Sequence, residues 1–135
     1  MRKKFMTAGI LIAGIFFFAT IAYAEVRVYE GVGEYWITKG ETMSFARQRA
    51  KEIAERDALE QIYLYVSSQS SVKNLQLDKD EIITIAAGLM YVTNTKFSVA
   101  TDNGVFIAGV VVTAEIDPDE IPAAVEREKQ KHLQD

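Results

Sequence analysis

Ser70 and Lys73 are the side chains whose types and spacing come closest to supporting covalent chemistry. Their Ser-x-x-Lys spacing could, on a helix, pair a nucleophilic serine with a lysine base. The pair lies in the polar stretch 67–74, which predicts a loop, and the sequence holds no companion motif of such an enzyme. We therefore interpret the spacing as part of a loop, and a small hydrolase is the alternative that it leaves open.

Histidine and cysteine offer little further chemistry. The chain has one histidine, His132, and no cysteine. A position near the C-terminus suits a solvated side chain better than a ligand or a base. We therefore expect no histidine-based metal site, no Ser-His triad and no disulfide.

Four carboxylates lie close together in the segment 52–60 and could suggest acid–base catalysis or a cation site. Basic residues occur three or four positions from them, which is the spacing of ordinary surface ion pairs on a helix. The pattern predicts a solvated face, on which Asp57 borders an apolar stripe and is expected to be partly buried. The acids are Glu52, Glu55, Asp57 and Glu60, and the bases are Arg47, Lys51 and Arg56.

Two other spacings match known motifs only in part. The run 78–81 begins like a calcium loop, but the glycine and the later glutamate of the EF-hand spacing are missing, so a helix cap explains it more simply. Gly31-x-Gly33 lacks the third glycine and the βαβ unit of a dinucleotide fingerprint. The sequence therefore predicts no catalytic residue, no metal and no cofactor.

Residues 1–24 indicate where the protein works. A basic start is followed by an apolar run from Phe5 to Ile21, and then by the small-x-small site 22–24. This order is typical of a secretory signal peptide, and the run is short for a membrane span. We expect a cleaved signal, no transmembrane span after cleavage and a periplasmic protein. An uncleaved anchor and peripheral membrane association are the alternatives, and the missing cysteine excludes a bacterial lipid anchor.

The remaining 111 residues suit one domain, which we place at 25–120, with a charged C-terminal helix or tail at 121–135. Beyond the signal, 12 basic residues stand against 19 acidic ones, a formal net charge of −7. This charge repels phosphate backbones, so nucleic acid is not expected as a partner.

A strand and a long helix are predicted first. In 25–37, one parity carries Val26, Val28, Val32 and Trp36, and the other carries tyrosines together with Gly31 and Gly33. The helix, from about Thr42 to Val66, carries an alanine stripe that allows close packing, and we expect the stripe to lie over the two glycines. The stripe is Ala46, Ala50, Ala54 and Ala58.

A second helix and a hairpin follow. The helix should begin after Asp78, run through Ala87 and close at Gly88. Asn103-Gly104 is a strong signal for a two-residue type I′ turn. It sets Phe97 opposite Val110, Val99 opposite Ala108 and Tyr91 opposite Ile116, all on one face.

The hairpin's second face is also partly apolar, because it carries Val92, Ile107 and Val111. A helix opened by Pro122 could cover some of this face, and otherwise a partner protein would. Tyr and Trp dominate interface hot spots, so Tyr35 and Trp36 join these three as candidate partner-binding residues.

The chain resembles the N-terminal domain of the flagellar assembly protein T (FlgT) family and the related small outer-membrane lipoproteins. The match spans roughly 28–116 and is carried by Gly31-x-Gly33, the run 46–50 and later single positions. The resemblance implies an exported, non-enzymatic module that helps to build envelope assemblies such as flagellar motor rings. The lipid-acceptor cysteine of the lipoproteins and the further domains of the flagellar protein have no counterpart here. The later positions are Ala54, Asp57, Ala58, Gln61, Val66, Ser67, Ser68, Asn74, Asp80 and Gly88.

These observations predict an α+β fold. A three-stranded, mostly antiparallel sheet carries one long alanine-striped helix, with a short second helix and a C-terminal helix. The expected function is protein interaction in the cell envelope, linked to flagellar assembly through the resemblance, with envelope proteins or a second copy of the chain as partners. The alternative is a small periplasmic protein that binds a lipid or another apolar ligand between helix and sheet.

Overall fold

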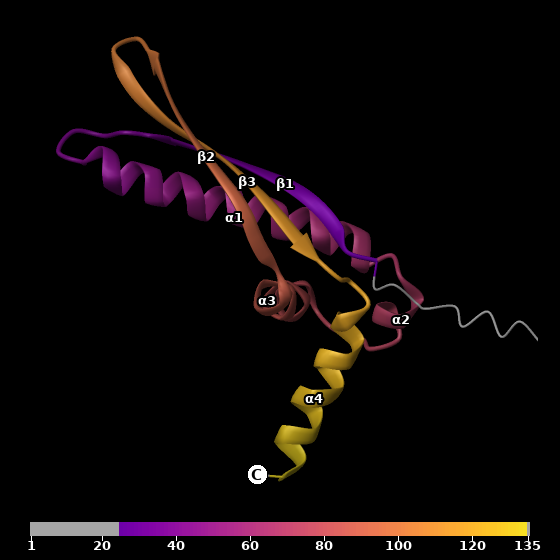
Figure 1. Ribbon diagram of the computed structural model, residues 1–135. Coiled ribbons are helices and arrows are strands. Elements are labelled where there is room, and N and C mark those ends of the chain that lie inside the picture. The colour runs from indigo at the N-terminus through magenta and orange to yellow at the C-terminus, as the bar shows by residue number, and fades with distance from the viewer. Residues whose placement is uncertain (1–24, 135) are drawn as a thin grey trace, which may run out of the picture.

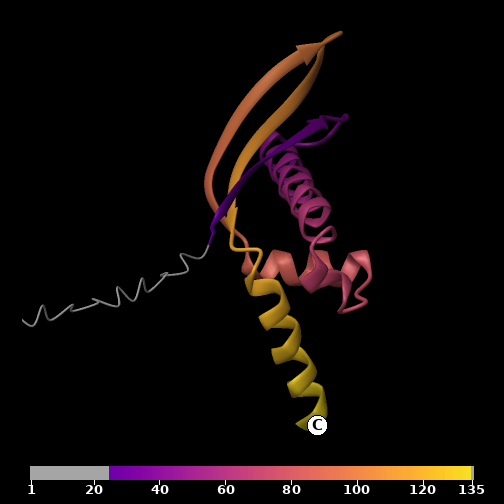
Figure 2. The same cartoon turned by 90° about the vertical axis from the view of Figure 1, so that its right-hand side faces the viewer.

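The fold is α+β: a three-stranded antiparallel sheet in the order β1-β3-β2, with one long helix packed on it (Figure 1). The computed structural model describes residues 25–134, so the predicted signal peptide lies outside the described residues. In Figure 2, α1 lies on one side of the sheet, and α3 and α4 lie at one end. The elements are β1 (Arg27–Trp36), α1 (Met43–Val66), α2 (Ser70–Lys73), α3 (Lys79–Leu89), β2 (Tyr91–Asp102), β3 (Val105–Ile116) and α4 (Glu120–Gln134).

The alanine stripe of α1 packs directly on the two glycines of β1, as predicted. All four alanines of the stripe are fully buried. A Cβ on Gly31 would overlap the carbonyl oxygen of Ala54, and one on Gly33 would overlap that of Ala50. The helix backbone therefore occupies the space that strand side chains would otherwise fill.

The core has two parts. Under the first turns of α1, small side chains from the alanine stripe meet the α1-facing side of β3. Near the C-terminal end of α1, larger side chains from α1, α2, α3 and α4 pack together. The first cluster contains Ala46, Ala50, Ala54, Ala58, Ala108, Val110, Val112 and Ala114, and the second contains Leu59, Ile62, Val66, Val72, Ile82, Ile83, Ala86, Ile116 and Ile121.

The helix starts agree with the sequence, but two other boundaries do not. Thr42 caps α1 by accepting a hydrogen bond from the Phe45 N–H at 3.1 Å, and Asp78 caps α3 in the same way. The predicted loop 67–74 contains the one-turn helix α2, because burial of Val72 fixes that turn against the core. α3 continues through Gly88 to Leu89, since the chain passes straight from the helix into β2 without a left-handed residue at the junction.

The hairpin turn is the predicted one. Asn103 and Gly104 have φ values of 48° and 80°, as a type I′ turn requires. Phe97 pairs with Val110 and Val99 with Ala108. The prediction for Tyr91 is wrong: an irregularity between Val92 and Asn94 shifts the register, so that Tyr91 pairs with Glu115 instead of Ile116.

The C-terminal helix does not cover the sheet, contrary to one expectation. The buried side chains of α4 are Ile121 and Val125, in its first two turns, where it packs against α2 and α3. The rest of the helix points away from the sheet (Figure 1). The charged residues that follow have too little apolar surface to hold the helix against a strand.

Candidate interaction surface

The outer face of the sheet, which is the face turned away from α1, carries a strip of apolar side chains. Trp36 of β1 pairs with Ile107 of β3, and Val32 pairs with Val111. Paired residues point to the same side of an antiparallel sheet, so these four side chains lie together. Val32 and Trp36 are 53% and 48% exposed. We call Val28, Val32, Trp36, Ile107 and Val111 the apolar strip.

No described element covers the apolar strip. α1 lies on the opposite side of the sheet, and α3 and α4 lie beyond its end (Figure 2). Charged side chains interrupt the strip, because Glu30 and Glu34 alternate with its β1 residues on the same face and Glu115 pairs with Val28. On β1 and β3 these are Glu30, Glu34 and Glu115, so the surroundings of the strip are mainly acidic there.

Two of the five predicted partner-binding residues do not lie on the outer face. The register shift pairs Val92 with Ala114, which is buried on the α1 side, so Val92 shares that side. Tyr35 also faces α1, where its ring meets Phe45 edge-on at 5.9 Å between centroids. The structure brings Trp36 onto the same face as Ile107 and Val111. Val28 and Val32 were missed as members, although they share the parity of Trp36.

The free edge of β1 is closed by side chains of α1. Asp57 accepts a hydrogen bond from the Val32 N–H at 2.9 Å, and Gln61 Nε2 donates to the Glu30 carbonyl at 2.7 Å. These two backbone groups point away from β3, toward the side of β1 on which a further strand would bind. Asp57 is half-buried, as expected, and serves the strand edge instead of a catalytic site.

The free edge of β2 is open. The Ile37 N–H donates to the Phe106 carbonyl at 3.0 Å. Because successive residues of a strand direct their backbone groups to opposite sides, the even-numbered residues of β3 form their hydrogen bonds with β1. Their β2 partners, which include Phe97 and Val99, must direct their N–H and C=O groups to the free edge. Phe97 and Val99 are 50% and 46% exposed, because α1 packs mainly on β1 and β3.

The helix carboxylates behave as a surface network, as predicted. Glu52 pairs with Arg49 at 2.8 Å, and Glu55 lies 3.9 Å from Lys51. Glu60 binds Arg56 at 3.3 Å and also Lys79 of α3 at 2.8 Å. The hydrogen bond from Lys79 lowers the pKa of Glu60, so this carboxylate joins two helices.

The turn between β1 and α1 is fixed by Glu41. This carboxylate accepts hydrogen bonds from the backbone and side chain of Thr38 and, at 2.7 Å, from the Tyr35 hydroxyl. These bonds lower the pKa of Glu41, and the Glu41 bond raises the pKa of Tyr35. The Tyr35 hydroxyl therefore anchors the turn between β1 and α1.

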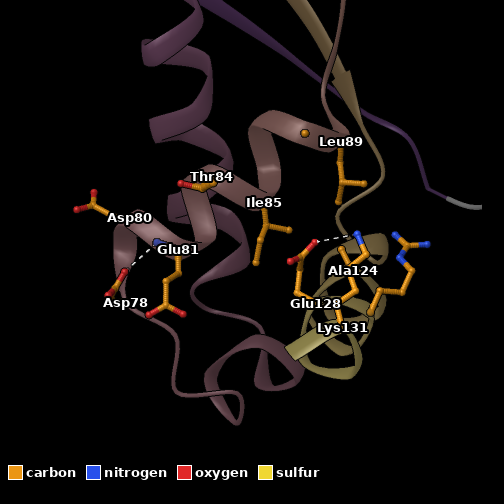
Figure 3. A pocket seen from close by; sticks show the side chains of 11 residues that line it. Asp78, Asp80, Glu81, Thr84, Ile85, Leu89, Ala124, Glu128 and Lys131 are labelled. Carbon is orange, nitrogen blue, oxygen red and sulfur yellow. Dashed lines mark hydrogen bonds and ion pairs between the residues drawn. The ribbon is translucent and has the colours of Figure 1, made fainter. Parts of the chain in front are cut away.

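An open groove of about 700 Å³ lies between α3 and α4 (Figure 3). Ile85, Leu89 and Ala124 form its apolar part. Acidic side chains of α3 line one side, and Glu128 and Lys131 of α4, 3.7 Å apart, line the other. The groove could hold a small amphiphile, whereas α1 packs directly on β1 at Gly31 and Gly33. A smaller open hollow of about 350 Å³ lies between the start of α1 and Phe97 of β2.

Within residues 25–134, no group of three or more His, Asp or Glu side chains is placed to hold a metal. Over the same residues, no helix is both long and apolar enough to cross a membrane. No family model, no curated protein and no solved structure matches the chain.

Proposed function

We propose that the protein is an exported, non-enzymatic interaction module that helps to assemble or stabilise a complex in the cell envelope. The observation that carries this proposal is the apolar strip on an uncovered sheet face. A tryptophan beside aliphatic side chains is the composition of an interface hot spot. Exposed apolar side chains that gather on one face and have polar neighbours often mark interaction sites.

The charge around the strip indicates the kind of partner. Glu30 and Glu34 alternate with the strip residues of β1, and Glu115 pairs with Val28. A partner that presents an apolar centre with lysine or arginine at its rim would match this face. Complementary charge of this kind mainly speeds association and selects among partners, while the apolar centre supplies the affinity.

The resemblance to the FlgT N-terminal domain family supports an envelope role and suggests a flagellar one. Several residues that carry it have one shared task in this fold. Gly31, Gly33 and the alanine stripe allow the close helix–strand contact, and Asp57 and Gln61 bond the edge of β1. These residues would keep the helix and the sheet packed together, while the residues of the outer face could differ between proteins of this kind.

A capture experiment with matched variants tests this function. The tagged chain is crosslinked in cells, recovered from the envelope fraction and analysed by mass spectrometry. We expect one envelope protein to be recovered in stoichiometric amounts by the wild type. The double variant Ile107→Glu with Val111→Glu should lose it while keeping its circular dichroism spectrum.

Leu64→Glu is the control, because Leu64 is an exposed apolar residue on α1, away from the outer face. It should capture the same protein as the wild type. Equal capture by all three chains would reject the outer face as the binding surface. Recovery of the chain alone would count against the interaction function.

The second candidate function is binding of a lipid or another apolar ligand, and the groove between α3 and α4 favours it. Arg127 and Lys131 at the groove could hold an anionic head group while Ile85 and Leu89 contact its chain. Native mass spectrometry of the purified protein should then show a retained ligand that Ile85→Glu abolishes. A clean apo mass would reject this function.

A further inference from the structure

The edge of β2 is built to receive another strand. Four consecutive odd-numbered residues, Thr95, Phe97, Val99 and Thr101, direct their backbone N–H and C=O groups outward. All four are β-branched or aromatic, which favours a strand, and β2 contains no proline. Within residues 25–134, no element pairs with this edge, so its hydrogen-bonding groups are available to a second chain.

We infer that β2 of a second copy occupies this edge, running antiparallel, so that two chains share one six-stranded sheet. The inference does not depend on the proposed function, because its hydrogen bonds come from the edge of β2 and the charges that set its register do not belong to the apolar strip. The β1 edge cannot serve in the same way, because Asp57 and Gln61 already bond its central groups.

Charge complementarity selects the register. A two-fold axis through Val99 sets Lys96 of each copy directly opposite Asp102 of the other, on the outer face. Oppositely charged cross-strand neighbours stabilise such a pair. Among residues 25–134, neither Lys96 nor Asp102 has an ion-pair partner within the chain. Pairing between copies would supply one to each.

Neighbouring registers lack this match. An axis through Ser98 would set Lys96 opposite Ala100 and Asp102 opposite Asn94, and an axis through Phe97 would set Lys96 opposite Ser98. An axis through Lys96 itself would place two lysines against each other. The register through Val99 is therefore the one in which both charges of the edge are paired.

The same register buries apolar surface on the α1 side. It sets Val99 opposite Val99, and Phe97 opposite Thr101, so two half-exposed apolar side chains per copy gain neighbours. The axis is perpendicular to the sheet, which keeps both α1 helices on one side. α1 packs mainly over β1 and β3 and reaches β2 at Phe97, where the Arg47 guanidinium lies 5.6 Å from the centre of the ring.

A charge-swap series tests the inference. Sedimentation of the chain from residue 25 onward, over a series of concentrations, should show a monomer–dimer equilibrium. Lys96→Asp and Asp102→Lys should each weaken the dimer about tenfold, because each creates two like-charge pairs. The double swap should restore it. Circular dichroism checks that each variant is folded.

Three results would overturn the inference: a wild type that stays monomeric, single variants that dimerise as well as the wild type, or a double swap that fails to recover. The outer-face variant Trp36→Ala changes β1, which is separated from β2 by β3, so it should lose partner capture and still dimerise. A variant that loses partner capture but still dimerises, or one that loses the dimer but still captures the partner, would show that the two properties are separate.

Single cysteines then report the register, since the natural chain has none. Val99→Cys places two sulfurs across the axis at a backbone separation of about 5.5 Å, which a disulfide can bridge. The matched control Phe97→Cys holds its two copies about 14 Å apart along the strands and should stay unlinked under the same oxidation. Crosslinking of Phe97→Cys but not of Val99→Cys would overturn the assigned register.

Discussion

The two edges of this sheet are treated in opposite ways. β1 is held under α1, and two helix side chains bond its free backbone groups. β2, at the other edge, receives no such bonds from residues 25–134, and Phe97 and Val99 are half-exposed. The difference arises from glycine: Gly31 and Gly33 let α1 approach β1 so closely that Asp57 and Gln61 can reach the strand edge. Close packing on one side thus closes one edge and leaves the other open.

The largest effect should come from breaking the close contact of α1 with β1. Gly33→Ala would drive a Cβ into the Ala50 carbonyl and the Ala54 N–H, so the helix must move away from the strand. We expect a loss of about 3 kcal/mol in the free energy of unfolding, measured by urea titration.

Gly88→Ala is the matched control for that change. Gly88 lies inside α3, and a Cβ there meets nothing within 4 Å. The substitution should stabilise the protein by about 0.5–1 kcal/mol through helix propensity. If Gly33→Ala were as well tolerated as Gly88→Ala, the close contact would not be what holds α1 in place.

A smaller effect should follow from opening the β1 edge itself. Asp57→Ala removes the acceptor of the Val32 N–H, and we expect a loss of about 1 kcal/mol. Asp57→Asn keeps an acceptor and should lose less. Glu52→Ala, which removes a surface pair with Arg49, should stay within about 0.5 kcal/mol of the wild type. An equal loss for Asp57→Ala and Glu52→Ala would deny the edge contact any special role.

Truncating a side chain at the β2 edge should lower the free energy of unfolding of the monomer less than truncating a buried side chain would. Phe97→Thr, studied at a concentration where the chain is monomeric, removes a ring that is already half-exposed. We expect the free energy of unfolding, measured by urea titration, to fall by about 0.5 kcal/mol. This loss is well below that expected for truncating a buried side chain. A loss of several times that size would mean that the ring is part of the core.

The smallest effect should be a change in pH dependence. Lys79 lowers the pKa of Glu60 in the folded chain below its ordinary value of 4.5. The contribution of this carboxylate to stability is therefore present above that value and is lost as pH falls through the folded pKa. Thermal unfolding midpoints should fall less steeply in acid for Glu60→Gln than for the wild type. Identical acid profiles for the two chains would contradict this.

The close packing of α1 on β1 could be predicted because two glycines on one face of a strand and an alanine at every fourth position of a helix leave room for the two backbones to approach. Gly31-x-Gly33 and an alanine every fourth residue are complementary shapes, and the structure joins them. The Asn103-Gly104 turn was equally predictable, since few other dipeptides accept two positive φ values. Local geometry of this kind is encoded in single residues.

The features that were not predicted depend on which strands pair and which strands the helix covers. β1 pairs with β3, so α1 covers β1 and β3 and leaves β2 with exposed side chains on the face that the hairpin register predicts to be core. The irregularity near Thr93 has no signature in the residue types, and it moved Val92 off the outer face. Ile107 and Val111 share a face as expected, because the hairpin register is regular there, whereas the pairing of β1 with β3 that adds Trp36 to this face was not predicted.

The most direct test of the difference between the edges is residue-resolved amide hydrogen exchange on the dilute chain. The Val32 amide, bonded to Asp57, should exchange slowly, and the Val99 amide, which faces the open edge, should exchange quickly. Raising the concentration should slow exchange at Phe97, Val99 and Thr101, whose N–H groups face the second copy, and should leave Val32 unchanged. A Val99 amide that is as protected as Val32 in the dilute chain would contradict the account, because the β2 edge would then be closed within a single molecule.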